Sequence, residues 1–183
     1  ESLYRFIGPP LHESYEKFYS FSREQAIQAV SYYREYYEEK GMFENEVYPG
    51  IKELLRVLTK QGILCLVATS KPEIYAKKIL DYYKLRTYFH YIAGANMDGT
   101  RTDKAEVIAY ALKQIPAEYN NKKILMVGDR SHDIIGAKKN GIDCAGVLFG
   151  YGSREELEEA GADFVADSVE AVRNIILLDT AMN

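Results

Sequence analysis

With 183 residues, the chain can bury one hydrophobic core plus a modest insertion, which excludes two large independent domains. Hydrophobic residues make up 47% of the sequence and charged residues 27%, a balance that is typical of globular proteins and excludes disordered and collagen-like classes. The net charge of -4 is small and spread along the chain, so no basic surface indicates nucleic acid or an anionic membrane as a partner.

Cys65 and Cys144 each lie inside an apolar run. Free cysteines pack as small hydrophobic residues, so we expect two buried, reduced thiols and a cytoplasmic location. No apolar run approaches the roughly 18 residues of a membrane span. The sequence starts at Glu1 and its first methionine is Met42, which indicates a truncation or processing point at the start.

Helical patterns rich in aromatic residues fill the first part of the chain, to about residue 46. The expected elements are a helix end over 2–7 stopped by Gly8-Pro9-Pro10, a short amphipathic helix over 11–20 and a longer helix over 23–40. Ser22 is a favourable cap for the longer helix, and Gly41 is expected to end it in the left-handed conformation. A packing face is predicted for six residues at helical spacing: Ala26, Ala29, Val30, Tyr33, Tyr36 and Tyr37.

From about residue 48, helical patterns alternate with short apolar runs. The expected strands are 63–68, 88–94, 122–127, 142–149 and 163–166, and the expected helices are 49–60, 72–84, 102–114, 131–140, 154–160 and 168–178. Such alternation predicts an α/β fold in which a parallel sheet is covered by helices on both faces. Ligands bind at the carboxyl ends of the strands in such sheets, so each loop that follows a strand is a candidate site.

The strongest single feature is the turn that follows the apolar run 124–127. Gly128 ends this run, and Asp129 and Asp133 follow four residues apart at the start of a helix. Two carboxylates this close repel each other unless a cation lies near them, and Mg²⁺ prefers carboxylate oxygens, waters and phosphate oxygens. A plain helix N-terminus that uses both aspartates for capping is the alternative.

A second candidate follows the strand expected over 63–68. Thr69 could donate its hydroxyl to a phosphoryl oxygen, and the Ser70 N–H could add a second bond at the start of a helix. An ordinary helix cap explains the same residues without any ligand.

Lys104 is a third candidate, because a lysine at the start of a helix is unfavourable for the helix dipole unless an anion lies nearby. An ordinary exposed lysine is the alternative.

Taken together, these residues resemble the motifs of the haloacid dehalogenase superfamily, and the resemblance spans essentially the whole chain. The second motif of that family is a Thr or Ser that ends an apolar strand, the third is a Lys, and the fourth is Gly-Asp-x-x-x-Asp. Thr69, Lys104 and the pair Asp129 and Asp133 match these motifs in order. The resemblance implies a three-layer, Rossmann-like α/β/α core over 48–183 and a small α-helical cap over 1–47.

Further segments are similar to the phosphoglycolate phosphatase branch and its 5′-nucleotidase-like relatives. They are Gly8-Pro9-Pro10-Leu11, Tyr48-Pro49-Gly50, Gly150-Tyr151-Gly152-Ser153 and Glu155-Glu156-Leu157.

The first motif of the family, Asp-x-Asp-Gly-Thr, does not occur in the sequence. Its first Asp is the nucleophile of the family and its second the general acid and base. Asn96-Met97-Asp98-Gly99-Thr100 mimics this motif, but asparagine cannot serve as the nucleophile, so we expect a loop that leads to Lys104. The resemblance places the strand of the first motif between those of Thr69 and Asp129, so we expect a strand and helix of roughly 30 residues before Glu1.

The resemblance therefore implies a Mg²⁺-dependent hydrolase of small phosphorylated metabolites, similar to phosphoglycolate phosphatase, that works through an aspartyl-phosphate intermediate. Thr69, Ser70 and Lys104 would bind the phosphoryl group, and Asp129 and Asp133 the metal ion. By itself this chain is expected to be inactive. Its expected oligomeric state is a monomer or a homodimer. A 5′-nucleotidase, a sugar-phosphate phosphatase and a non-catalytic module that binds phosphorylated ligands are the alternatives.

Overall fold

The computed structural model of the chain describes residue 6 and residues 11–180. Apart from residue 6, the helix end expected over 2–7 and the Gly8-Pro9-Pro10 stop lie outside these residues. Among the helices of the described part, none combines the length and the apolar character needed to cross a bilayer.

Two helices and a short turn make up the first part of the described chain: α1 (Leu11–Tyr19), α2 (Arg23–Glu39) and the 3₁₀ turn η2 (Gly41–Phe43). Ser22 caps α2 as predicted, in a capping box with Gln25. The prediction that Gly41 takes the left-handed conformation is wrong, because the chain runs from α2 into η2 without a positive φ at this glycine.

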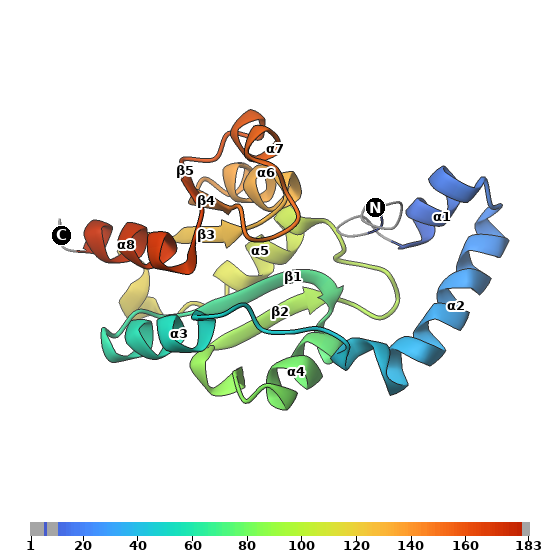
Figure 1. Ribbon diagram of the computed structural model, residues 1–183, viewed down its shortest axis with the longest axis horizontal. Helices are drawn as coiled ribbons and strands as arrows, with labels where there is room; N and C mark the ends of the chain where they lie inside the picture. Colours follow the sequence, from blue (N-terminus) through green and yellow to red (C-terminus); the bar gives the residue numbers. More distant parts are fainter. Residues whose placement is uncertain (1–5, 7–10, 181–183) are drawn as a thin grey trace.

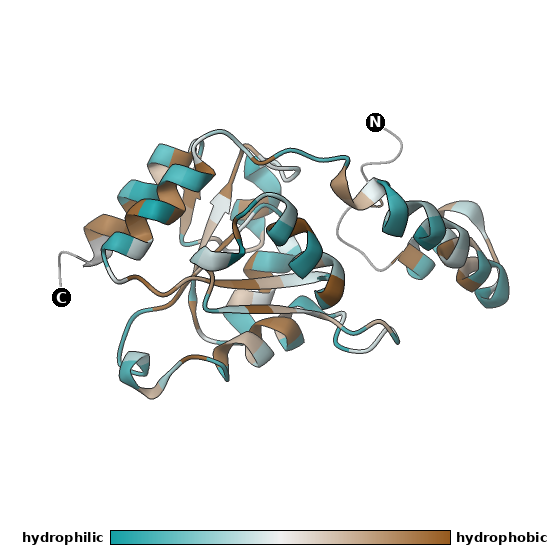
Figure 2. Ribbon diagram, turned by 90° about the horizontal axis from the view of Figure 1, so that it is seen from below, coloured by the Kyte–Doolittle hydropathy of each residue, from teal (hydrophilic) through white to brown (hydrophobic). Residues whose placement is uncertain are grey.

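The packing face predicted for α2 is correct only in part. Ala26 and Tyr37 are buried, whereas Tyr33 is 37% exposed and Tyr36 is 53% exposed. Figures 1 and 2 show the reason, since α1 and α2 project to one side of the sheets and have few elements to pack against.

The remaining chain alternates between helices and strands. The helices are α3 (Ile51–Lys60), α4 (Glu73–Tyr82), α5 (Lys104–Leu112), α6 (Ser131–Lys139), α7 (Arg154–Glu159) and α8 (Val169–Thr180), with 3₁₀ turns η3 (Arg86–Tyr88) and η4 (Ala117–Tyr119). The strands are β1 (Leu66–Pro72), β2 (Tyr91–Ala95), β3 (Leu125–Gly128), β4 (Asp143–Val147) and β5 (Phe164–Ala166). Every strand and helix expected from residue 48 onward is therefore present.

Three strands start three residues later than expected, and the last of them begins at Leu125 instead of residue 122. The strand expected from residue 63 starts at Leu66, because its partner strand starts at Tyr91, opposite Leu66. The strand expected from residue 88 begins late for a related reason, since the chain first forms η3.

All strand pairs are parallel, but the strands form two separate groups. β1 pairs with β2, and β3 pairs with β4, which pairs with β5. Within the described residues no ladder joins β1 to β3. The edges of these two strands line a largely apolar cavity of about 730 Å³.

Helices close the sheets from both faces (Figure 1). α4 and α5 pack against β1 and β2, α6 and α7 against β4, and α8 against β5. Helices α3, α5 and α8 also line the cavity between β1 and β3. The apolar colour in Figure 2 concentrates on the strands, while the outer helices are mixed. The three-layer α/β/α fold with parallel strands and an α-helical part outside it is therefore confirmed.

The two cysteines are free thiols. Cys144 is fully buried, in a cluster with Ile134, Ala137 and Leu157. The expected full burial of Cys65 is wrong, because this residue precedes β1 and faces the cavity, where it is partly exposed.

Candidate active site

Lys104 joins the carboxyl ends of the two strand groups. Its Nζ donates to the carbonyl oxygen of Ala68 in β1 at 3.2 Å and lies 2.8 Å from Oδ1 of Asp133 in α6. Both charged side chains are largely buried, at 15% exposure for Lys104 and 8% for Asp133. The carboxylate of Asp133 is therefore the anion that was expected near Lys104. Two of the predicted site residues are in direct contact.

Asp133 is fully engaged by the turn that precedes it. Its Oδ2 accepts the N–H of Asp129 at 3.1 Å and the N–H of Arg130 at 3.2 Å. With Lys104 on its other oxygen, this carboxylate satisfies two helix N-terminal donors and one ammonium group. Asp133 thus fixes the backbone that carries Asp129.

Asp129 has one oxygen bonded and one oxygen available. Its Oδ2 accepts the N–H of Tyr151 at 2.9 Å, and its Oδ1 has no hydrogen-bond partner among the described residues. Tyr151 lies in the loop after β4, so the ends of two neighbouring strands fix this carboxylate.

Glycines make room for both carboxylates. A Cβ atom at Gly128 would lie 2.3 Å from Cβ of Asp133, and one at Gly150 would lie 2.3 Å from Cβ of Asp129. Real Cβ atoms do not approach other carbons so closely, so no side chain is compatible with this arrangement at either position. Gly128 and Gly150 are therefore needed for space.

Glu156 holds the outer side of the same turn. Its Oε1 accepts the N–H of Ser131 at 2.8 Å and Nε of Arg130 at 2.9 Å. Burial opposes the ionisation of Glu156, but the hydrogen bonds from Ser131 and Arg130 outweigh it and lower the pKa of this carboxyl. Glu156 is therefore an ionised carboxylate that fixes the first turn of α6.

Thr69 lies where β1 departs from its regular ladder with β2. Thr69 is opposite Gly94 and Pro72 is opposite Ala95, so Ser70 and Lys71 form a bulge. Oγ1 of Thr69 accepts the N–H of Lys71 at 3.1 Å. Lys104 contacts the carbonyl of the preceding residue, which brings Thr69 near the lysine. No contact joins Thr69 to Asp129 among the described residues.

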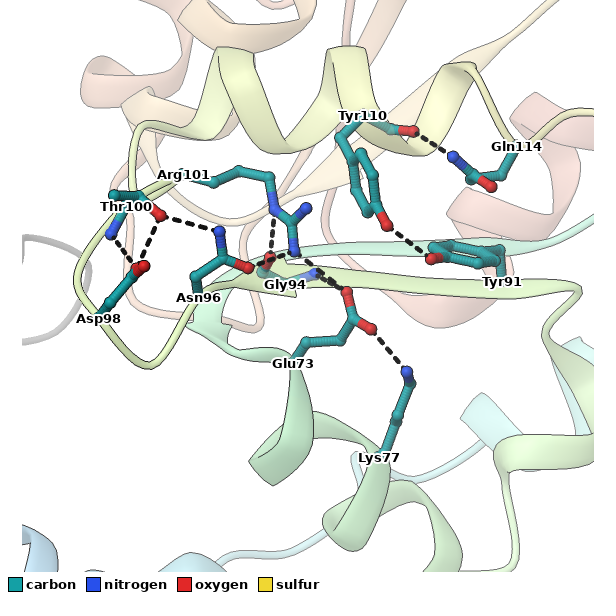
Figure 3. Close-up of polar contacts among 10 residues, drawn as sticks. All are labelled: Glu73, Lys77, Tyr91, Gly94, Asn96, Asp98, Thr100, Arg101, Tyr110 and Gln114. Carbon is teal, nitrogen blue, oxygen red and sulfur yellow. Dashed lines mark hydrogen bonds and ion pairs between the residues drawn. The ribbon is translucent and has the colours of Figure 1, made fainter.

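The loop between β2 and α5 is held by Arg101 (Figure 3). Its Nε donates to the carbonyl oxygen of Gly94 at 2.8 Å, and its Nη2 lies 3.3 Å from Glu73 and 3.0 Å from Oδ1 of Asn96. The guanidinium group also lies 3.8 Å above the ring of Tyr110. Arg101 thus fixes the loop three residues before Lys104.

The segment that mimics the missing family motif lies in this loop. Oδ1 of Asp98 accepts the side-chain hydroxyl of Thr100 at 2.7 Å and its N–H at 2.9 Å, and these bonds lower the pKa of Asp98. Asn96 bonds Thr100 and Arg101. These polar groups serve the loop, as the sequence predicted.

The donor set at Asp129 suits Mg²⁺ in part. In the described part of the chain, no three His, Cys, Asp or Glu side chains form a group that could hold a metal ion. Asp129 offers one oxygen without a hydrogen-bond partner among the residues that the structure describes, whereas Asp133 is bonded to Lys104 and two N–H groups. Mg²⁺ commonly uses one or two protein carboxylates together with waters and substrate phosphate. The residues present therefore fit a Mg²⁺ ion that takes its other ligands from outside this set.

Two groups that act on Asp129 and its turn were missed. The N–H of Tyr151 leaves no trace in the sequence, because any residue except proline supplies one. Glu156 was identified only as part of a family-like segment, and its distance of 25 residues from Ser131 hides the contact.

Comparisons with known proteins agree with this geometry. Residues 1–147 match the family described as haloacid dehalogenase-like hydrolase. A 5′-nucleotidase from Pseudomonas aeruginosa is 39% identical over 176 residues, which cover 95% of this chain and 78% of that protein. A phosphoglycolate phosphatase from Vibrio vulnificus is 28% identical over 172 residues, which cover 94% of this chain and 75% of that protein.

The chain is also similar to a protein kinase and to a solved phosphatase structure. The tyrosine-protein kinase PtkA of Mycobacterium tuberculosis is 36% identical over 173 residues, covering 93% of this chain but only 58% of that protein. The crystal structure of a predicted phosphatase from Clostridium acetobutylicum superposes with a TM-score of 0.87 at 45% identity, covering 96% of this chain and 81% of that one. The chain belongs to the haloacid dehalogenase-like hydrolase family, and its relatives include proteins named as phosphatases.

Proposed function

We propose that the ends of β1 and β3 form the phosphoryl-binding part of a phosphatase that hydrolyses small phosphomonoesters. The observation that carries this proposal is the position of Lys104, whose ammonium group bridges the end of β1 and the carboxylate of Asp133. An ammonium group has three donors, and two of them are used by Ala68 and Asp133. The third remains for a phosphoryl oxygen.

Thr69, Ser70 and Lys104 would hold the phosphoryl oxygens as negative charge builds up in the transition state. The Thr69 hydroxyl accepts the N–H of Lys71 and so keeps its own proton free to donate. Donors that are fixed before the substrate arrives need no rearrangement during the reaction, which is the basis of this kind of catalysis.

Asp129 would bind Mg²⁺ through Oδ1, while Asp133 would support the site through Lys104 and the backbone of the turn. When bound, Mg²⁺ would neutralise charge on the phosphoryl oxygens. The contacts of Asp133 favour this indirect role, because both of its oxygens are already occupied.

The nucleophile of the proposed reaction would be an aspartate on a strand that fills the cavity between β1 and β3. The cavity has unpaired strand edges on two sides and apolar helix faces from α3, α5 and α8 on the others. An apolar strand would satisfy the backbone groups of both edges, which are costly to leave unpaired when buried. Its carboxyl end would lie level with Thr69 and Asp129, where an aspartate could attack phosphorus and form an aspartyl phosphate.

Residues 1–47 would act as a cap that excludes water and selects the substrate. The names of two relatives point to phosphoglycolate or a nucleoside monophosphate as substrate, and a sugar phosphate is a further alternative. A non-catalytic module that binds phosphorylated ligands would use the same residues, and the absence of an Asp-x-Asp sequence from the chain favours it.

Reconstitution of activity tests the proposal. The chain would be mixed with a synthetic apolar peptide that ends in Asp-x-Asp-Gly-Thr, and Mg²⁺-dependent hydrolysis of p-nitrophenyl phosphate would be followed. We expect no turnover by the chain alone and measurable turnover with the peptide. The matched control is the same peptide with its first Asp replaced by Asn, which should be inactive because it lacks the nucleophile.

The variant Asp129→Asn separates the two candidate functions further. It should abolish the reconstituted turnover if Asp129 holds the metal ion. A peptide that binds the chain but gives no turnover would favour the non-catalytic module. Turnover that persists in Asp129→Asn would contradict the proposed metal site.

A further inference from the structure

Arg101 has a backbone conformation that its place in the chain does not explain. Its φ is +52°, a left-handed value that residues other than glycine rarely adopt. Within the described residues, Ser20 and Lys84 also have side chains and left-handed values, both at +56°. Each of these two follows a helix, α1 or α4, where a left-handed residue is a common way for a helix to end. Arg101 follows no helix and lies between β2 and α5, so its conformation needs another reason.

The side chain of Arg101 holds the backbone in this conformation (Figure 3). It reaches three elements at once, because it bonds Gly94 at the end of β2, Glu73 at the start of α4 and Asn96 in the loop itself. Its guanidinium group lies over the ring of Tyr110 in α5. The side chain is only 20% exposed, so water competes little for these contacts. Strained residues persist where the surrounding structure over-determines them, and such residues cluster at functional sites.

The turn at Arg101 leads directly into α5. Asp103 caps this helix, and its Oδ1 accepts two N–H groups of the first turn at 2.8 Å and 3.3 Å. Lys104 is the first residue of α5, and its stem passes over Gly136 of α6, where a Cβ atom would lie 3.0 Å from Cγ of the lysine. With its side chain 15% exposed and its stem packed in this way, Lys104 has little freedom to correct its direction if the turn shifts.

We propose that Arg101 is a positioning residue for Lys104, because it fixes the left-handed turn that aims the lysine at the phosphoryl group. This inference rests on the proposed function, since it needs Lys104 to bind a phosphoryl oxygen. Donors of an anion site are most effective when the fold holds them in place before the anion arrives. Arg101 itself does not touch the substrate, and Glu73 compensates its charge at 3.3 Å.

Calorimetric titration of variants with ethyl phosphate in the presence of Mg²⁺ tests the inference. Arg101→Gly permits the same positive φ but removes the contacts that fix it. Binding should therefore weaken by at least about tenfold, the size of one lost hydrogen bond to a charged group. Arg101→Lys keeps the charge but lacks the planar fork of donors, so it should weaken binding to a similar degree.

The matched control is Lys84→Gly. It replaces a left-handed residue of the same charge in the segment before β2, so it relieves the same backbone strain away from the proposed site. Lys84→Gly should bind ethyl phosphate like the wild-type chain.

A double-mutant cycle shows whether Arg101 acts through Lys104. Lys104→Met removes the ammonium group, so Arg101→Gly added to it should cause no further loss of the remaining affinity. The side-chain ¹³Cε and ¹⁵Nζ resonances of Lys104, recorded without ligand, give the same information if Lys104→Met fails to fold or to bind. These resonances should shift in Arg101→Gly and keep their positions in Lys84→Gly.

Wild-type affinity and unchanged Lys104 resonances in Arg101→Gly would overturn the inference and leave the proposed function intact. Full recovery of affinity in Arg101→Lys would also overturn it, because charge alone would then explain the effect. An equally large loss in the Lys104→Met background would show that Arg101 acts on another group. Failure of the wild-type chain to bind ethyl phosphate would contradict the proposed function and the inference with it.

Discussion

The two strands that flank the cavity end in opposite ways. At the end of β3, both oxygens of Asp133 and Oδ2 of Asp129 are bonded to a backbone N–H or to Lys104, and glycines pack against both side chains. At the end of β1, a bulge interrupts the ladder, and the partly buried Lys71 donates to the hydroxyl of Tyr37.

This difference indicates that the two strand ends have different roles. The end of β3 is arranged before any ligand binds, which suits a group that must hold a metal ion in fixed geometry. At the end of β1, the Thr69 hydroxyl accepts the N–H of Lys71 and keeps its own proton to donate, which suits a group that is completed by the substrate. Substitutions at the two ends should therefore affect stability and ligand binding in different proportions.

The largest effect is expected for Lys104→Met, which removes one partner of a buried ion pair. Asp133 would be left buried and charged, so the free energy of unfolding should fall by about 3 kcal/mol or more. Urea denaturation followed by circular dichroism measures this loss.

The double variant Lys104→Met with Asp133→Asn is the control for that prediction. It removes both charges, so it should be more stable than Lys104→Met alone, with a coupling of about 1 kcal/mol or more. Additive effects of the two substitutions would show that the ion pair contributes nothing to the end of β3.

Gly150→Ala should come next, because its Cβ would overlap Asp129. Overpacking of this kind typically destabilises by about 1–3 kcal/mol, and here it should also displace the Asp129 carboxylate and weaken Mg²⁺ binding. The matched control is Gly141→Ala, where a φ of +67° strains alanine but nothing lies within 4 Å. Gly141→Ala should lose about 1–2 kcal/mol of stability and keep Mg²⁺ affinity.

Glu156→Gln should have a smaller effect that depends on pH. The lowered pKa of Glu156 means that its contribution to stability is complete above its ordinary value of 4.5 and is lost as the pH falls through the lower value of the folded chain. Wild type should therefore be more stable than Glu156→Gln by about 1 kcal/mol at neutral pH. The difference should shrink as the pH falls below about 4.5 and through the lowered pKa, and a constant difference would contradict the ionised state of Glu156.

Ser22→Ala gives the smallest expected effect and lies far from both strand ends. It removes the capping hydroxyl of α2, which should lower stability by about 0.5–1 kcal/mol. Titration with ethyl phosphate should be unchanged, and a change would show that α2 influences the phosphoryl site.

The sequence predicted the order of strands and helices from residue 48 onward, because the apolar periodicity there is strong and glycines mark the ends. Gly62 and Gly141 indeed take positive φ after their helices. Gly41 does not take a positive φ, because glycine also permits a 3₁₀ turn. The turn is favoured here because Met42 packs into the interior.

The candidate site was predictable as far as each residue follows a strand. Lys104 follows β2 and Asp133 follows β3, and although they are 29 residues apart they form an ion pair where the two strand groups end. The contacts of Glu156 and the contact of Lys71 with Tyr37 were not predictable, because both depend on which distant loops and helices pack around them. No local pattern encodes such contacts.

The most direct test of the central claim is a titration of the ¹⁵N-labelled chain with Mg²⁺ and ethyl phosphate, followed by NMR. If the ends of β1 and β3 form one phosphoryl site, the amide resonances of Thr69, Ser70, Lys104 and Asp129 should shift together with a single dissociation constant. Shifts confined to one strand end, or separate dissociation constants for the two, would contradict a shared site.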